Sequence, residues 1–329
     1  MAVVKANAYG HGALEIAQAL EPLADALAVA CIEEAQELRA GGITGPILLL
    51  EGLFQESEMA VACNEKFWLC VENEWQLDFL ERATLPSPVV VWLKIDTGMH
   101  RLGIPPQLAA QAFDRLTQSA NVKQGIILCT HFASADELGS DQTRRQLEQF
   151  DVSCGHLQAE RSAANSPGVL AWPESHFDWI RPGYMLYGNS PFIEPHKNTS
   201  NLRPVMTLSS AIISVRDVAV GDTVGYGATW TAEKNSRIAT VAIGYGDGYP
   251  RLARNNTPVL INGVRAPLAG RVSMDMITVD VTELSHVKLG DEVILWGKNL
   301  SVGEVASHAH TIGYELTTRM PARTRRVIV

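Results

Sequence analysis

The chain has 329 residues with 27 basic and 36 acidic side chains, so its formal net charge is −9. An acidic chain without clustered Lys and Arg lacks the phosphate contacts that nucleic-acid binding requires. Its apolar runs, such as residues 46–50 and 89–93, are far shorter than the roughly 18 residues of a membrane span. No signal peptide is recognisable at the start, so we expect a cytoplasmic protein with neither nucleic acid nor membrane as a partner.

The five cysteines are odd in number, widely spaced and without a CxxC pair. This spacing favours reduced, structural side chains over a disulfide framework or a zinc site. His308 and His310 have no carboxylate or cysteine at ligand spacing, so no metal site is expected there either.

In the first 190 residues, short apolar runs alternate with longer amphipathic segments, a pattern typical of repeated βα units. The predicted strands cover residues 2–5, 27–31, 47–51, 67–71, 89–95, 125–130, 158–163 and 177–180. The predicted helices include residues 13–20, 33–40, 74–83, 107–118 and 142–154. Eight strands separated by helices favour a (β/α)8 barrel over an open sheet.

From about Leu202 the pattern changes to short alternating segments separated by turns such as Asn262-Gly263. The predicted strands here cover residues 206–215, 237–243, 258–261, 276–281 and 292–296. We therefore expect a barrel domain over residues 1–200 and a mostly β domain over residues 201–329. The proline-rich and polar segment 191–204 is the expected boundary.

The barrel hypothesis can be tested on polar residues, because active-site residues of such barrels lie at the carboxyl ends of the strands. Polar residues do follow the predicted strands, at Lys5, Lys94, Asp96, His131, Asn165, Ser166 and Arg181. The last two strands are followed by the Ser166 hydroxyl and by what we expect to be a free backbone at Gly183 and Tyr184, which predicts a phosphate site.

Lys5 directly follows the apolar run Ala-Val-Val. One interpretation is a lysine that extends its charged end to solvent from the end of a strand. The other is an amine of lowered pKa that forms a Schiff base with a carbonyl compound or with pyridoxal phosphate. Tyr9, Gly10 and Gly12 would then allow a cofactor to approach closely.

The segment AVVKANAYGHG at residues 2–12 resembles the pyridoxal phosphate attachment motif of the bacterial alanine racemases. Further segments resemble the same family in the same order: KIDTGMHRLG at 94–103, THFASAD at 130–136, NS at 165–166, RPGY at 181–184, VGYGAT at 224–229, GYGDGYPR at 244–251, GRVSMD at 270–275 and GYE at 313–315. The resemblance covers essentially the whole chain. It implies a pyridoxal 5'-phosphate enzyme that interconverts L-alanine and D-alanine in a head-to-tail homodimer.

The resemblance assigns two catalytic bases, Lys5 and Tyr226, with Tyr226 acting in the active site of the neighbouring subunit. It implies that Arg101 and Met274 bind the substrate. It assigns the cofactor to Lys5, Tyr9, His131, Asn165, Ser166, Arg181, Gly183, Tyr184 and Tyr314. Supporting residues and residues of the access path would be Lys94, Asp136, Tyr245, Arg251, Arg271 and Asp275.

Two of these roles carry physical expectations. Arg181 would face the pyridine nitrogen, to which a permanently charged guanidinium can donate a hydrogen bond but not readily a proton. Lys94 would repel Arg101 unless its amine were carbamylated, as the resemblance implies. For His131, a ring packed on the cofactor competes with a merely hydrogen-bonded structural role.

Three functions are weighed. Alanine racemisation, for D-alanine supply to the cell wall or for L-alanine catabolism, fits all the motifs. A related decarboxylase would pair a carboxylate with the pyridine nitrogen, which Arg181 opposes, and a non-catalytic pyridoxal phosphate carrier would lack the second domain and Tyr226. Family members usually carry a longer segment before the lysine motif. We therefore expect an upstream strand and helix to be missing here, with a loss of stability or of cofactor occupancy.

Overall fold

The structure is a computed structural model that describes residues 1–329, and the chain divides into two compact units. One unit comprises residues 1–186 and 190–201, and the other comprises residues 187–189 and 202–329. None of the helices combines the length and the apolar character that crossing a lipid bilayer would demand.

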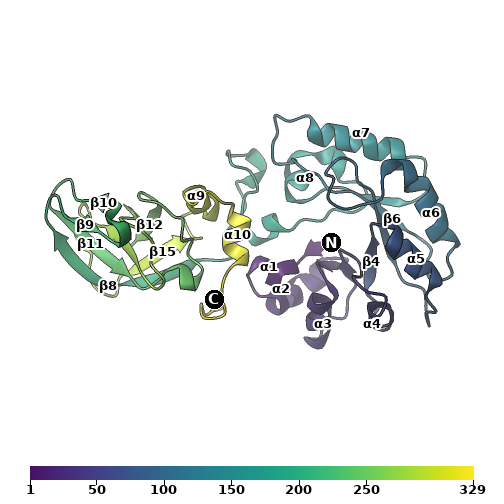
Figure 1. The fold of residues 1–329 in the computed structure, drawn as a ribbon, viewed down its shortest axis with the longest axis horizontal. Coiled ribbons are helices and arrows are strands. Elements are labelled where there is room, and N and C mark those ends of the chain that lie inside the picture. The colour runs from purple at the N-terminus through teal and green to yellow at the C-terminus, as the bar shows by residue number, and fades with distance from the viewer. The chain divides into compact units, whose positions relative to one another are not determined.

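The N-terminal unit is built on seven parallel strands that pair in chain order, with helices between them (Figure 1). The strands are β1 (Ala2–Val3), β2 (Leu27–Val29), β3 (Ile47–Leu49), β4 (Trp68–Val71), β5 (Val91–Lys94), β6 (Ile127–Cys129) and β7 (Glu160–Ser162). The helices are α1 (Lys5–Tyr9), α2 (Ala13–Leu20), α3 (Ile32–Ala40), α4 (Glu58–Asn64), α5 (Glu74–Arg82), α6 (Ala109–Gln118), α7 (Gln142–Cys154) and α8 (Ser166–Ala171). The predicted α/β barrel is confirmed, and the predicted bounds of 13–20 and 142–154 match α2 and α7.

The eighth strand, predicted over residues 177–180, does not form. Only Trp179 pairs with β7, through an isolated parallel bridge to Ser162. Phe177 has a positive φ of 46°, and Pro182 has no N–H to donate to a ladder, so a regular strand cannot extend through this segment. The segment still closes the barrel, because the Val3 N–H donates to the Pro182 carbonyl at 3.0 Å.

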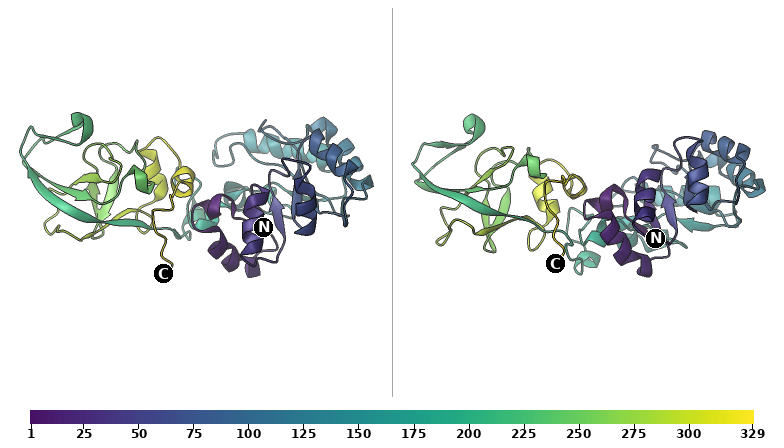
Figure 2. Two further views of the ribbon diagram at one scale, coloured as in Figure 1. Left: turned by 60° about the horizontal axis from the view of Figure 1, so that its bottom comes forward. Right: turned by 90° about the horizontal axis from the view of Figure 1, so that it is seen from below.

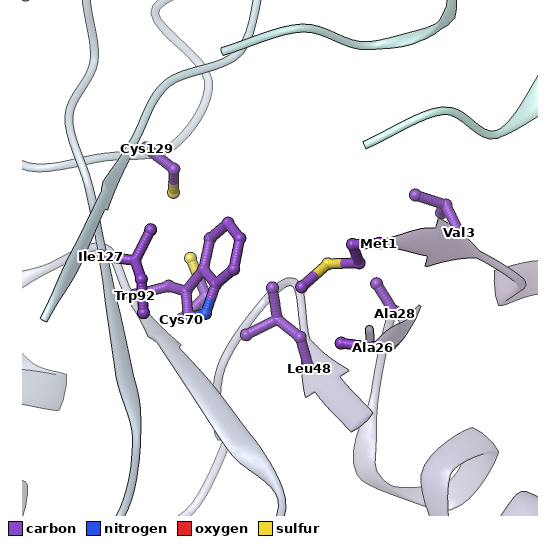
Figure 3. Close-up of a cluster of buried hydrophobic side chains, with 9 residues drawn as sticks. All are labelled: Met1, Val3, Ala26, Ala28, Leu48, Cys70, Trp92, Ile127 and Cys129. Atoms are coloured by element: carbon purple, nitrogen blue, oxygen red, sulfur yellow. The ribbon is translucent and has the colours of Figure 1, made fainter. Parts of the chain in front are cut away.

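Apolar side chains from the strands fill the barrel interior, as expected for strands that are covered on both faces. Figure 3 shows nine buried residues of this cluster, among them Met1, Leu48, Cys70, Trp92 and Cys129. Trp179 packs edge-on against Trp92, with ring centroids 5.5 Å apart. The segment that replaces the eighth strand is therefore anchored by core packing as well as by its backbone hydrogen bonds.

The C-terminal unit is mostly β structure, as predicted. Six antiparallel strands pair in the order β13-β12-β15-β8-β11-β14, and β9 pairs with β10 separately. The bounds are β8 (Leu208–Val218), β9 (Thr223–Val224), β10 (Trp230–Thr231), β11 (Ser236–Val241), β12 (Pro258–Ile261), β13 (Val264–Pro267), β14 (Ile277–Asp280), β15 (Glu292–Trp296), α9 (Val302–Ser307) and α10 (Gly313–Thr318). Both views in Figure 2 show the two short helices, in yellow, at one end of this unit.

The Asn262-Gly263 turn is confirmed as the connection of a tight hairpin. Ile261 pairs with Val264, so two residues form the loop between β12 and β13. Asn262 and Gly263 have φ of 51° and 81°, the left-handed conformation that a type I′ turn requires at both positions.

Two glycines of the C-terminal unit both have a positive φ, but only one of them would bring an added Cβ into a clash. Gly188 has a φ of +74°, and a Cβ placed there would lie 1.6 Å from the Arg203 carbonyl oxygen. Gly263 has a φ of +81° with no atom near its Cβ position. We expect Gly188→Ala to lower the free energy of unfolding by at least about 3 kcal/mol, and Gly263→Ala by only about 1 kcal/mol. Urea unfolding of both variants measures the difference, and equal losses would contradict the assignment of Gly188 as a packing constraint.

Candidate active site

Lys5 lies at the carboxyl end of β1 and begins an unusual left-handed turn. Ala6, Asn7, Ala8 and Tyr9 have φ of 52°, 56°, 52° and 53°. Each such residue costs roughly 1–2 kcal/mol relative to ordinary backbone, so the turn must be held by its surroundings. The predicted strand over residues 2–5 therefore ends early, at Val3, and the lysine belongs to the turn.

Burial lowers the pKa of the Lys5 amine below its ordinary value. The negative charges of Glu51 and Glu34 oppose this shift, whereas the positive charges of Arg101 and Lys94 reinforce it. A lowered pKa increases the fraction of the amine that is neutral, and the neutral amine is the form that attacks a carbonyl carbon. The surroundings therefore favour the nucleophilic interpretation of Lys5.

Four cationic groups act on His131, which follows β6. Burial and the charges of Arg181, Lys94, Arg101 and Lys5 lower the pKa of His131 well below its ordinary value. The ring is therefore neutral across the physiological pH range. The structure thus brings together, at one end of the barrel, the basic residues that were predicted separately from four strand ends.

Lys94 forms a buried ion pair that the sequence analysis did not include. Its Nζ lies 3.3 Å from Glu72 Oε2, and Glu72 is only 5% exposed. Burial raises the pKa of Glu72, while Lys94 opposes that rise. The pair offsets the charge of an unmodified Lys94, which reduces the repulsion that was expected between Lys94 and Arg101.

Glu72 could have been found by the rule that identified Lys94. It follows β4 directly, just as Lys94 ends β5, and Glu51 lies two residues after β3.

Tyr9, Ser166 and Gly183 lie together at the expected phosphate site. A Cβ at Gly183 would lie 2.5 Å from the Tyr9 hydroxyl, so only glycine allows this approach. The Gly183 backbone was predicted to be free, but its N–H donates to Ser166 Oγ at 3.0 Å, as does that of Met185 at 3.2 Å. Because Ser166 accepts both bonds, its own hydroxyl proton is directed elsewhere.

Arg181 is buried, with an exposed fraction of 7%. Its Nη2 donates to the Thr130 carbonyl at 2.5 Å, and its Nη1 donates to Ser162 Oγ. Burial lowers the pKa of Arg181, although a guanidinium stays charged in proteins. Its Nε–H makes no hydrogen bond in the structure, so it is available to an acceptor.

The other barrel residues have more local roles. The Asn165 side chain caps α8 by accepting the Gly168 N–H at 3.1 Å. Tyr184 is 3% exposed, and burial raises its pKa, as burial raises the pKa of Tyr9 to about 12. Asp136 is exposed.

In the C-terminal unit, Tyr226 is 70% exposed at the start of a short 3₁₀ helix (Tyr226–Ala228) between β9 and β10. Gly225 and Gly227 flank it with φ of 77° and 74°. A Cβ at Gly227 would lie 3.2 Å from Arg271 Nη1, so the arginine packs directly against this loop. The structure thus brings Arg271 next to the residue that follows Tyr226.

Two further loops of this unit are joined by backbone hydrogen bonds. The Tyr245 N–H donates to the Ser273 carbonyl at 3.0 Å, and the Gly246 N–H donates to the Met274 carbonyl at 2.8 Å. Tyr245 and Met274 are exposed by 41% and 53%. Both predicted residues are therefore presented side by side on the surface of the unit.

Arg323 holds these loops together and was not predicted. It donates to Asp247 Oδ1 and to Asp275 Oδ1, both at 2.7 Å. The pKa of Asp247 is lowered. Partial burial acts to raise it, but hydrogen bonds from Arg323 and from the Gly244 N–H outweigh that effect. Arg323 follows the last helix, α10, where nothing in the local pattern identifies its partners.

The remaining predicted residues of this unit lie on separate elements. Tyr314 is partly buried in α10, and Arg251 is exposed after the Tyr245 loop. Neither residue joins the two groups described above, which are Tyr245 with Met274 and Arg271 with the Tyr226 loop.

Comparisons with known proteins cover nearly the whole chain. Residues 1–191 match the family described as alanine racemase, N-terminal domain, and residues 205–328 match alanine racemase, C-terminal domain. The alanine racemase of Pseudomonas taetrolens is 51% identical over 96% of this chain and 88% of its own length. The biosynthetic alanine racemase of Escherichia coli K12 is 50% identical over 98% of this chain and 90% of its own.

Solved structures agree with the sequence relatives. The crystal structure of the biosynthetic alanine racemase from Pseudomonas aeruginosa has a TM-score of 0.95 and 49% identity, covering 99% of this chain and 91% of that one. The crystal structure of alanine racemase from E. faecalis has a TM-score of 0.89 and 32% identity, covering 98% of this chain and 89% of that one.

The lowered pKa of Lys5 can be measured by competitive acetylation of the cofactor-free protein across a range of pH. We expect the midpoint for Lys5 to lie below the ordinary lysine value of about 10.4. Lys234 serves as an internal control, because its ion pair with Glu283 raises its pKa. Peptide mapping resolves the two sites, and a Lys5 midpoint at or above that of Lys234 would contradict the assignment.

Proposed function

We propose that this chain, which belongs to the alanine racemase family, interconverts L-alanine and D-alanine with Lys5 and Tyr226 as its two bases. Racemase activity follows from the family and from about half identity to curated alanine racemases over nearly the full length. The observation that carries the residue assignment is Lys5 itself, a partly buried lysine of lowered pKa surrounded by charged strand ends.

The barrel end has the groups that pyridoxal 5'-phosphate needs. Lys5 offers a nucleophilic amine, and Tyr9 and Ser166 offer hydroxyl groups at the point where the close approach of Tyr9 to Gly183 requires glycine. The Nε–H of Arg181, which has no partner in the chain, suits a ring nitrogen. When bound, the cofactor withdraws electrons from the α-carbon of an amino acid and so makes its α-proton acidic.

The further cofactor contacts are proposed from the same set of residues. We assign His131, kept neutral by its cationic neighbours, to packing against the ring. Tyr184 and Tyr314 complete the phosphate contacts, and Asn165 fixes Ser166 through its cap on α8.

Inversion at the α-carbon requires proton removal on one face and proton delivery on the other. Lys5 serves one face. For the other we propose Tyr226, which Gly225 and Gly227 present at the surface of the C-terminal unit. Arg271 packs against Gly227, so its positive charge lies beside the loop that carries Tyr226.

Arg101 and the backbone of Met274 are proposed to bind the substrate carboxylate. Arg101 is exposed, and its charge acts on Lys5, Glu72 and His131, so it lies beside the reacting amine. Lys94 is proposed to support Arg101, with Glu72 as the counter-ion of Lys94. Carbamylation of Lys94 would place a second negative charge beside the Glu72 carboxylate. Asp136, Tyr245, Arg251, Arg271 and Asp275 are proposed to line the access path.

The high exposure of Tyr226 supports a head-to-tail homodimer, in which one subunit's Tyr226 acts on the cofactor held by the other. An exposed general base gains a water-free environment only when another surface covers it. A second copy of the chain supplies that surface, and two-fold symmetry then gives two equivalent sites.

The two-base assignment can be tested with L-alanine and D-alanine in heavy water. We expect Tyr226→Phe to lose racemisation by at least about a hundredfold, while one enantiomer still exchanges its α-proton without inversion, because Lys5 remains. NMR measures deuteration, and optical rotation measures inversion. Loss of exchange for both enantiomers, or full racemisation, would contradict the assignment of Tyr226. Decarboxylation products, or a bound cofactor without any exchange, would favour the other two functions.

Shared active sites can be tested by mixing subunits. Lys5→Ala and Tyr226→Phe chains are each expected to be inactive, but a mixed dimer contains one site with both bases intact. Random reassociation should therefore restore up to about a quarter of the wild-type activity. If both bases come from one chain, mixing restores nothing.

A further inference from the structure

In the left-handed turn after Lys5, the Ala6 N–H has no hydrogen-bond acceptor within the turn itself. Within and after the turn, the N–H groups of Ala8, Gly10 and Gly12 donate to the carbonyls of Val4, Ala6 and Asn7 at 2.8, 3.0 and 3.0 Å. The Ala6 N–H precedes this series and has no acceptor within it. It is the first amide after Lys5, so its position is tied directly to that of the lysine.

Glu34 supplies the missing acceptor from α3. Its Oε1 accepts the Ala6 N–H at 2.7 Å, and its Oε2 accepts the Ala30 N–H at 2.7 Å. Ala30 directly follows β2, which is the neighbour of β1 in the barrel. One carboxylate thus joins the carboxyl ends of the first two strands, with both oxygens in short, charge-assisted bonds.

Only a carboxylate fits this geometry. Each oxygen accepts from a different backbone donor, and an amide side chain would set its NH₂ group against one of the two N–H groups. Other acidic residues of α3 do not share this arrangement, since Glu37 is exposed one turn further along the helix.

We propose that Glu34 is a positioning residue for Lys5, which holds the strained turn through the Ala6 N–H and thereby sets where the lysine amine points. This rests on the proposed function of Lys5 and adds a residue that no motif assigned. The charge of Glu34 also acts on the amine, where it and Glu51 raise the pKa and Arg101 and Lys94 lower it.

The test compares the holoenzymes of wild type, Glu34→Gln, Glu37→Gln and the double variant Glu34→Gln with Ala6→Gly. Ala6 is exposed and has a φ of 52°, so glycine there relieves strain without removing a buried side chain. Hydrogen exchange of the peptide covering residues 1–12 reports on the turn, and kcat and KM for alanine report on the lysine.

For Glu34→Gln we expect exchange in this peptide to be at least about tenfold faster and kcat to fall at least about tenfold with KM changed less than twofold. Glu37→Gln should match wild type in both. The added glycine should restore most of both losses, because it lowers the strain that Glu34 offsets. If Glu34→Gln does not fold, the double variant carries the test and is expected to fold and turn over.

Wild-type exchange and turnover in Glu34→Gln would overturn the proposal. So would losses that the glycine does not reverse, because Glu34 would then act only on Ala30 and α3. If the wild type did not racemise alanine, the proposed function would fail, whereas the exchange arm would still decide whether Glu34 holds the turn.

Discussion

The hydrogen bond from the Val3 N–H to the Pro182 carbonyl is the contact on which the candidate site depends. It joins the first strand to the segment that stands in place of an eighth strand. Lys5 follows one side of this seam, and Arg181 and Gly183 flank the other. Closing the barrel and assembling the two ends of the proposed cofactor site are therefore the same structural event.

Electrostatic balance is the second constraint on this end of the barrel. Lys5, Lys94, Arg101 and Arg181 all act on His131, and such a concentration of like charge would be unstable by itself. Acidic side chains at other strand ends offset it, Glu72 by direct pairing with Lys94 and Glu51 through its charge on Lys5. A phosphorylated cofactor and a substrate carboxylate are the anions that such a surplus of positive charge suits.

The sequence predicted most of the fold because alternation of apolar and amphipathic segments is a local signal. It could not predict the loss of the eighth strand, which depends on the backbone of Phe177 and on the absence of an N–H at Pro182. Most residues of the site were predicted from strand ends and motifs. Glu72, however, pairs with Lys94, 22 positions away, and Arg323 pairs with Asp275 and Asp247, 48 and 76 positions away. Such pairs become visible only when the chain is folded. The free backbone expected at Gly183 was wrong for the same reason, since its N–H already bonds to Ser166.

Glu34 lies 28 positions after the amide that it holds. During synthesis the chain emerges from its amino terminus, so the Lys5 turn leaves the ribosome well before its acceptor does. An ordinary helix or hairpin can form from local contacts alone, but this turn cannot, since its conformation is unfavourable without α3. Lys5, the nucleophile that we propose, is thus made before the residue that holds its turn, and the turn cannot acquire its geometry until α3 has packed beside it.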